Sequence, residues 1–195
     1  MTPHRPAFRF PLRRMAPTLS AATMLLLGAC ASAPTARAPA PETSTLAHAQ
    51  AVMTPASASL VSGKLSLTAV AGGVRVTGEL GGLQGAGIHA IHIHEKGDCS
   101  AVDATSAGGH FNPDAQPHGR AGQGAHHGGD MDNFVADAQG VARVDVQARG
   151  VTLGGNRTDI VGRAVVVHAV ADDYTTQPAG NAGARVACGI IKAVP

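Results

Sequence analysis

Apolar and polar residues alternate along most of the chain after residue 60. Residues 64–70 (KLSLTAV) place Leu and Ala at every second position, an Ala-Gly-Gly turn follows, and residues 74–80 (VRVTGEL) continue the same period of two. Successive side chains of a β-strand point to opposite faces, so this period gathers the apolar residues on one face. The two segments and their turn predict a β-hairpin.

Later segments with the same character are also expected to be strands: residues 87–94 (GIHAIHIH), 140–148 (GVARVDVQA), 164–170 (AVVVHAV) and 184–194 (ARVACGIIKAV). No window of the sequence keeps a helical period over three turns. The predicted fold class is therefore all-β, an antiparallel Greek-key barrel or sandwich of about eight strands. Two long Gly-rich segments, 97–133 and 171–183, interrupt the strands, and loops of that length in a compact domain are usually functional.

The composition fits such a domain and argues against nucleic-acid binding. The 195 residues suffice for one domain with extensions. Hydrophobic residues make up 44% of the chain but aromatic residues only 3%, so Val, Ile, Leu and Ala must build the core. The net charge of +2 gives no basic patch, and a single Tyr with no Trp leaves little that could stack on bases.

Residues 1–29 are typical of a secretory signal peptide. Residues 1–14 carry four Arg and no acidic residue, and an apolar stretch from Met15 to Ala29 follows. A transmembrane anchor is the alternative, but about 15 apolar residues fall short of the roughly 20 that cross a bilayer. The ending LGAC resembles a bacterial lipoprotein signal, in which cleavage leaves Cys30 as the lipidated N-terminus. We therefore expect a lipid anchor on Cys30.

Residues 30–57 are predicted to be this lipidated cysteine followed by a flexible tether. They are rich in Ala, Pro, Ser and Thr and show no sustained apolar period. His48 lies in this segment and is expected to be solvated. The folded domain is then expected to cover residues 58–195.

The cysteines predict a disulfide bond. With Cys30 lipidated, Cys99 and Cys188 remain as a pair, and such pairs close in the oxidising compartment of an exported protein. A bridge would enclose a loop of about 90 residues, which corresponds to roughly 4–5 kcal/mol of stabilisation at most. Two unrelated buried thiols are the alternative. A zinc site built on these thiols is disfavoured because neither has a second Cys nearby.

Seven of the ten histidines lie between residues 89 and 127, which marks a candidate site. On a strand, His92 and His94 share one face while His89 points to the other, so we expect His89 to be a structural residue that hydrogen-bonds backbone. Further donors follow in the loop and on a later strand: His110, His118, His126, His127, Asp130 and His168. Imidazoles with one carboxylate suit Cu(II) and Zn(II), and there are more donors than one four-coordinate site needs. Two metals are therefore expected.

Several stretches together carry a family resemblance: AIHIHEKGDC (90–99), SAGGHFNP (106–113), HGR, HHGGD, VVVHAVADD (165–173) and GNAGARVACGII (180–191). In sequence and in order they resemble the Cu,Zn superoxide dismutases, from about residue 60 to the end. The signal, the tether and the position of the first Cys after HEKGD resemble the periplasmic bacterial branch of that family. Unlike its eukaryotic members, this chain has no Lys or Glu in residues 171–183.

The resemblance implies a role for each candidate residue, with one copper and one zinc per subunit. Copper ligands would be His92, His94, His110 and His168; zinc ligands would be His110, His118, His127 and Asp130. His110 would thus bridge the metals and also carry a proton in catalysis. Asp172 would link a copper-ligand histidine to a zinc-ligand one, and Arg185 would attract the anionic substrate. The family spacing selects His127 over His126 for zinc, which leaves His126 solvated.

The implied activity is the conversion of two superoxide anions to dioxygen and hydrogen peroxide by copper redox cycling, with structural zinc. The implied location is the periplasm, with the lipid anchor in the outer membrane. A non-catalytic copper- and zinc-binding lipoprotein is the alternative function. Pairing of two copies into a homodimer stays open, because exposed surfaces cannot be recognised in the sequence.

Overall fold

The computed structural model of the chain describes residues 42–155 and 157–194. The predicted signal peptide (1–29) and the predicted lipidation site Cys30 lie outside the described residues. Within the described ranges, no helix is long and apolar enough to span a membrane.

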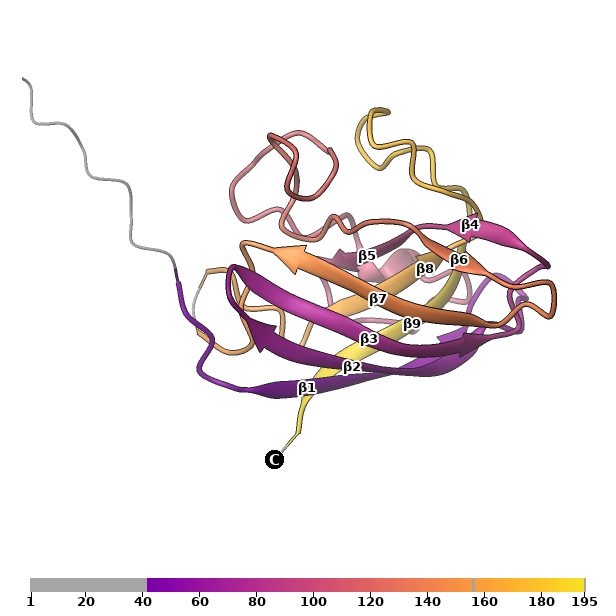
Figure 1. The fold of residues 1–195 in the computed structure, drawn as a ribbon, viewed down its shortest axis with the longest axis horizontal. Coiled ribbons are helices and arrows are strands. Elements are labelled where there is room, and N and C mark those ends of the chain that lie inside the picture. The colour runs from indigo at the N-terminus through magenta and orange to yellow at the C-terminus, as the bar shows by residue number, and fades with distance from the viewer. Residues whose placement is uncertain (1–41, 156, 195) are drawn as a thin grey trace, which may run out of the picture. The chain divides into compact units, whose positions relative to one another are not determined.

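The described chain is built from antiparallel strands that wrap into a nearly closed barrel (Figure 1). A single 3-10 turn, η1 (Thr105–Ala107), is the helical element among the described residues. The strands are β1 (His48–Pro55), β2 (Ser62–Val70), β3 (Gly73–Gly81), β4 (Gly87–His89), β5 (Ile91–His94), β6 (Phe134–Ala136), β7 (Ala142–Arg149), β8 (Ala164–His168) and β9 (Arg185–Ala193). The large sheet has the order β5-β8-β9-β1-β2-β3-β7, and β4 pairs with β6. The all-β prediction is confirmed.

The predicted hairpin is β2 and β3, joined at the Ala-Gly-Gly turn. Leu65 and Leu67 on β2 and Val74 and Val76 on β3 are all fully buried, as the period of two requires. Gly72 sits in the turn at φ 77°, a left-handed conformation that glycine adopts without steric cost. The buried side chains of β2 and β3 fill the barrel together with the inward-facing residues of β7, which has the same alternating burial.

The predicted tether is wrong over its C-terminal part, because His48–Pro55 is strand β1, inserted between β2 and β9. Ala49, Ala51 and Met53 are buried at every second position, while His48 is exposed. Two of these inward positions are alanines, which give a weak apolar signal in an Ala-rich segment. The backbone bonds to two neighbouring strands stabilise β1, so the domain begins before the predicted boundary at residue 58.

The predicted strand 87–94 is divided into β4 and β5 at Ala90. The backbone N–H of Ala90 donates to the Val170 carbonyl, and the N–H of His168 donates to the Ala90 carbonyl, so the chain changes partner at this residue. β4 then pairs with β6, whereas β5 pairs with β8. β2, β3, β7, β8 and β9 lie within about two residues of their expected limits, whereas the short strand β6 was not predicted.

Both long loops emerge on the same side of the barrel (Figure 1), and a disulfide joins one of them to β9. Cys99 and Cys188 are bonded with their Cα atoms 5.7 Å apart, across a sequence separation of 89 residues. The disulfide prediction is confirmed. The loop after Cys99 is thereby tied beside the end of β9 that carries Arg185.

Candidate metal centre

Strand pairing positions the first histidines of the site. β5 lies beside β8 in antiparallel register, and every residue of β5 is buried. Ile91 and Ile93 point into the hydrophobic core, so the alternating His92 and His94 face the other side together. On β8, Val165 and Val167 point into the core, so alternation places His168 on the same side as His92 and His94. The expectation that His92 and His94 share a face is confirmed.

Two extended segments of the long loop run along β5 and bring in further donors. Isolated β-bridges pair His94 with His110 and His92 with Asp130. The N–H of Ile93 donates to the Gly129 carbonyl at 2.9 Å. A Cβ on Gly129 would collide with the carbonyl oxygen of Ile93, so glycine allows this close approach.

The first group of donors, the all-histidine cluster, consists of His92, His94, His110 and His168. One ring nitrogen from each lies within 4.8 Å of the others. The nitrogens Nδ1 of His92 and Nε2 of the other three are buried and have no hydrogen-bond partner among the described residues. Leaving a buried polar atom unpaired costs about 1–3 kcal/mol, and here such atoms converge on one point. A cation bound there would satisfy all of them.

The opposite nitrogens of these rings are held by the protein. Nδ1 of His94 donates to the Gly108 carbonyl at 2.9 Å, and Nδ1 of His168 lies 3.5 Å from the Gly183 carbonyl. Because a carbonyl oxygen can only accept, the proton sits on Nδ1 and the lone pair of Nε2 faces the cluster. In His92 the arrangement is reversed, since its Nε2 donates to Asp172 at 2.8 Å.

The second group of donors, the carboxylate cluster, consists of His110, His118, His127 and Asp130. The Nδ1 atoms of the three imidazoles lie 2.8, 3.1 and 3.3 Å from Oδ1 of Asp130. Four ligands about 2.0 Å from a tetrahedral zinc ion are about 3.3 Å apart, so the donors already have the spacing of such a site. Oδ2 of Asp130 accepts the backbone N–H groups of Gly119 and His127, which fixes the carboxylate.

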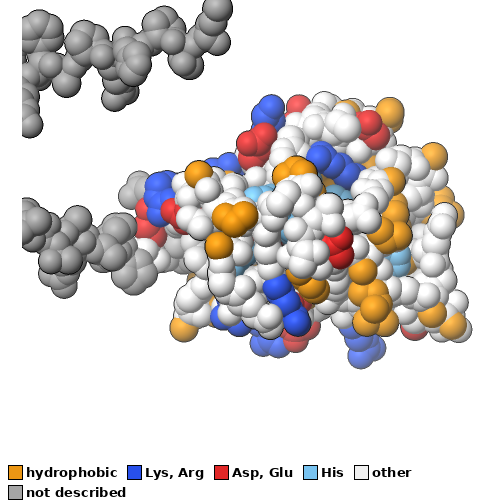
Figure 2. Space-filling model, turned by 90° about the horizontal axis from the view of Figure 1, so that it is seen from above, with side chains coloured by type: hydrophobic (Ala, Val, Ile, Leu, Met, Phe, Trp, Pro, Cys, Tyr) orange, Lys and Arg blue, Asp and Glu red, His pale blue; other side chains and the backbone are white. Residues whose placement is uncertain are grey.

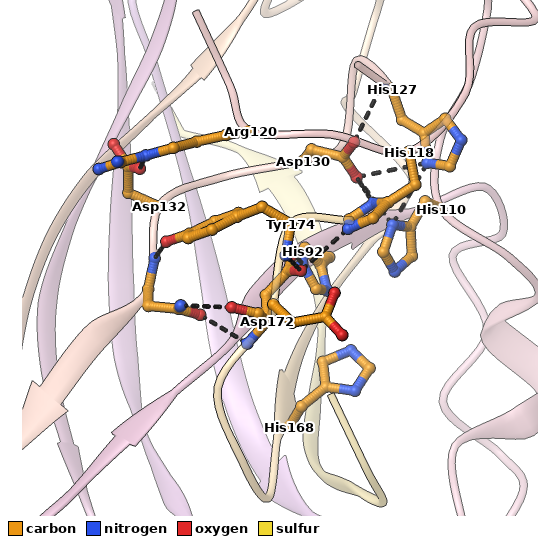
Figure 3. A network of polar contacts seen from close by, with 12 residues as sticks. His92, His110, His118, Arg120, His127, Asp130, Asp132, His168, Asp172 and Tyr174 are labelled. Carbon is orange, nitrogen blue, oxygen red and sulfur yellow. Dashed lines mark hydrogen bonds and ion pairs between the residues drawn. The ribbon is translucent and has the colours of Figure 1, made fainter. Parts of the chain in front are cut away.

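Two residues connect the clusters. His110 belongs to both, with Nε2 in the all-histidine cluster and Nδ1 beside Asp130. The Asp172 carboxylate accepts from Nε2 of His92 at 2.8 Å and from Nε2 of His118 at 2.9 Å, as Figure 3 shows. Asp172 therefore contacts one imidazole of each cluster, as the family resemblance implied.

The pKa values differ between the two clusters. Burial lowers the pKa of His94 to about 2 and that of His168 to about 3. Burial also lowers the pKa of His110 to about 4, against the opposing effect of Asp130. At His118 burial disfavours the charge, but hydrogen bonds to two carboxylates raise the pKa to about 9. His94, His110 and His168 therefore offer neutral lone pairs at pH 7, whereas metal binding at His118 must displace a proton.

A cavity of about 340 Å³ opens over the all-histidine cluster. It is lined by His94, Gly109, His110, Asn112, His127, His168, Pro178, Ala179 and Arg185. The Arg185 guanidinium donates to the carbonyls of Ala104 and Gly108, both at 2.7 Å, so loop carbonyls hold the cation in place. Figure 2 shows this loop-bearing face, where histidine side chains are visible as small pale-blue patches between the loops. The cavity thus has room for a small anion.

The remaining histidines lie outside both clusters. His89 is buried, and its Nδ1 bonds the carbonyl of His168 at 3.1 Å, as expected of a structural histidine. His126 is half-buried, and its Nδ1 donates to the carbonyl of His127 at 2.7 Å, so this ring is partly solvated and lies outside the carboxylate cluster.

Two amide side chains that were not predicted from the sequence, Asn133 and Gln177, bind the backbone of Asp172 and His118 respectively. Each lies in one of the two Gly-rich segments or at its end. Surface-loop amides are common, and no spacing distinguishes these two from the others in the chain.

The fold and the two clusters define the class of protein: an all-β protein with two adjacent candidate metal sites that share the imidazole of His110. The chain belongs to the copper/zinc superoxide dismutase family, since the family model described as copper/zinc superoxide dismutase (SODC) matches residues 61–191. This range is more than half of the chain.

Individual relatives carry names that agree with this family. A superoxide dismutase (Cu-Zn) 2 from Aquifex aeolicus is 45% identical over 107 residues, which cover 53% of this chain and 63% of the relative. A superoxide dismutase (Cu-Zn) from Caulobacter vibrioides is 46% identical over 112 residues, covering 54% and 64%. The matches thus span less than two thirds of these relatives. Among solved structures, the crystal structure of the clock protein EA4 has a similar fold, with a TM-score of 0.68 and 39% sequence identity. The match covers 77% of this chain and 97% of the EA4 chain.

Proposed function

We propose that this protein is a superoxide dismutase that converts two superoxide anions and two protons to dioxygen and hydrogen peroxide. The observation that carries the proposal is the pair of clusters joined through His110, in which four buried ring nitrogens lack any partner among the described residues. Family membership supports the same activity.

The chemistry of the donors assigns the metals. The all-histidine cluster suits copper, because imidazole nitrogens accommodate both of its common oxidation states. The carboxylate cluster suits zinc, because it offers three imidazoles and one carboxylate at tetrahedral spacing. Copper, when bound, supplies the one-electron redox chemistry that no protein side chain here can provide.

Arg185 binds and orients the substrate in this proposal. Its guanidinium lines the cavity beside His94 and His168, and it is the cationic side chain among the described cavity-lining residues. Burial lowers its pKa, but guanidinium stays charged in proteins. The charge attracts superoxide, and the fixed donors direct it toward the all-histidine cluster.

His110 moves a proton in this proposal. Its Nε2 faces the cluster beneath the cavity, while Asp130 bonds Nδ1 at 2.8 Å and keeps the ring in place. A proton held on Nε2 can pass to the departing peroxide, and water supplies the second proton.

The test is to load the full-length chain with copper and zinc and to measure superoxide decay against the same chain loaded with zinc alone. The expected result is rapid decay that requires copper and one equivalent of each metal. Binding of both metals without copper-dependent decay would refute the proposal and support the metal-binding lipoprotein instead.

The proposal also includes where the protein is located and how it is anchored. We propose a lipid anchor on Cys30 and a periplasmic position at the outer membrane, supported by the Arg-rich start and the LGAC ending of the first 30 residues. Metabolic labelling with a radioactive fatty acid, compared with Cys30→Ser, tests the anchor.

A homodimer is proposed through the exposed cross-strand pair Ile88 (55% exposed) and Val135 (66% exposed). Sedimentation of the chain with and without Ile88→Lys tests this pairing.

A further inference from the structure

Two amide side chains connect the two long loops at the residues that support the metal clusters. Asn133 lies at the end of the loop that carries the carboxylate cluster, and Gln177 lies in the loop that carries Asp172. Each amide binds both the N–H and the carbonyl of a single residue in the other loop. Such a paired contact fixes position and orientation together, because one amide satisfies a donor and an acceptor at once.

Asn133 holds the residue that touches both clusters. The N–H of Asp172 donates to Oδ1 of Asn133 at 2.9 Å, and Nδ2 of Asn133 donates to the Asp172 carbonyl at 2.9 Å. The backbone N–H of Asn133 also donates to the hydroxyl of Tyr174 at 2.9 Å. Figure 3 shows Tyr174 and Asp172 in the same network of polar contacts as the carboxylate cluster.

Gln177 makes the matching contact in the opposite direction. The N–H of His118 donates to Oε1 of Gln177 at 2.8 Å, and Nε2 of Gln177 donates to the His118 carbonyl at 2.9 Å. His118 is a proposed zinc ligand, and the residues after Gln177, Pro178 and Ala179, line the cavity that faces Arg185. Gln177 thus joins the zinc side of the site directly to the cavity wall.

The loops are also packed closely where the amides hold them. A Cβ on Gly180 would collide with Oδ1 of Asp172 and with the ring of His118, so this turn rests against both residues. The N–H of Asp173 donates to the Gly180 carbonyl at 2.9 Å, which closes the loop on itself. A displacement of His118 therefore has a direct path to the cavity wall.

We propose that Asn133 and Gln177 are positioning residues that transmit order from the zinc ligands to the cavity wall. The inference rests on the proposed metal assignment. When a metal fixes His118, the Gln177 amide fixes residues 177–179; when Asp172 is fixed through His92 and His118, the Asn133 amide holds the start of the same loop. Zinc then shapes the entrance used by the substrate without contacting it.

Hydrogen exchange of residues 171–183 in the full-length chain tests this transmission, measured metal-free and with one equivalent of zinc, and without copper. Zinc is expected to slow exchange in the wild-type chain and in the control Thr175→Ala. Thr175 is an exposed residue of the same loop whose side chain bonds Asp173. In Gln177→Ala we expect zinc to bind but its protection of this loop to fall roughly tenfold or more, since two hydrogen bonds are lost.

The zinc-dependent part of the protection separates positioning from general stability. A residue with a merely structural role would speed exchange equally in the metal-free and zinc-loaded states, and that result would overturn the proposal. Unchanged zinc-dependent protection in Gln177→Ala would overturn it too. Asn133→Ala is expected to act in the same way. If Asn133→Ala fails to fold, the exposed Gln177 decides alone, and superoxide decay plays no part in the readout.

Discussion

Replacing Asp172 with Asn tests how the clusters depend on the carboxylate between them. The Asp172 side chain is fully buried and accepts from His92 at 2.8 Å and from His118 at 2.9 Å. An amide can present one oxygen and one NH₂ group, so one of the two rings must face a donor. His92 is fixed within β5 whereas His118 lies on a loop, and we expect His118 to lose its acceptor and shift.

The expected result is a ten- to hundredfold fall in zinc affinity, about 1.4–2.7 kcal/mol, as is usual when the hydrogen-bond partner of a metal ligand is removed. Competition with a chelator of known zinc affinity measures it on the full-length chain. Asp173→Asn is the matched control, because Asp173 is exposed and its side chain bonds Thr175 and Thr176. Zinc affinity of Asp172→Asn within threefold of the control would refute the reasoning.

Other predictions follow from the same geometry. Arg185→Glu should lower the superoxide decay rate by about ten- to a thousandfold and remove most of its salt dependence, while the exposed Arg143→Glu should change little; equal rates in metal-loaded proteins would contradict the role of Arg185. His94→Ala should abolish copper-dependent activity, whereas His89→Ala should keep both metals, as metal analysis after dialysis will show. The metal-free chain should lose stability on acidification. His94 and His168 have pKa values of about 2 and about 3. In the unfolded chain both rings bind protons below about pH 6.5. Each of the two histidines should therefore lower the free energy of unfolding by about 1.4 kcal/mol per pH unit below that value. Urea unfolding at pH 7.5 and at pH 5 measures this loss.

The strand pattern could be predicted from the sequence because it depends on local geometry, whereas the full set of ligand positions was implied by the family resemblance. Alternation along a strand is a property of the backbone itself, so it placed His92 and His94 on one face and His89 on the other before any neighbour was known. The family resemblance implies a zinc histidine three residues before the aspartate, which selects His127 over His126, and the structure brings His127 to the carboxylate cluster.

Weak local signals explain the errors. The sequence predicts a tether where β1 lies because two inward positions of this strand are Ala49 and Ala51, and alanines in an Ala-rich segment leave little apolar pattern. The division at Ala90 was missed because it arises from a change of hydrogen-bonding partner, which depends on where β6 and β8 lie.

Tertiary structure alone decided how the two long loops meet. The contacts of Asn133 with Asp172 and of Gln177 with His118 join residues 39 and 59 positions apart, and they depend on the path of both loops over the same end of the barrel. The carbonyls that orient His94 and Arg185 are backbone groups, which every residue carries. The sequence by itself determined which side chains can bind metal; the fold determined which of their nitrogens face each other, because that choice lies with hydrogen-bond partners brought in from distant segments.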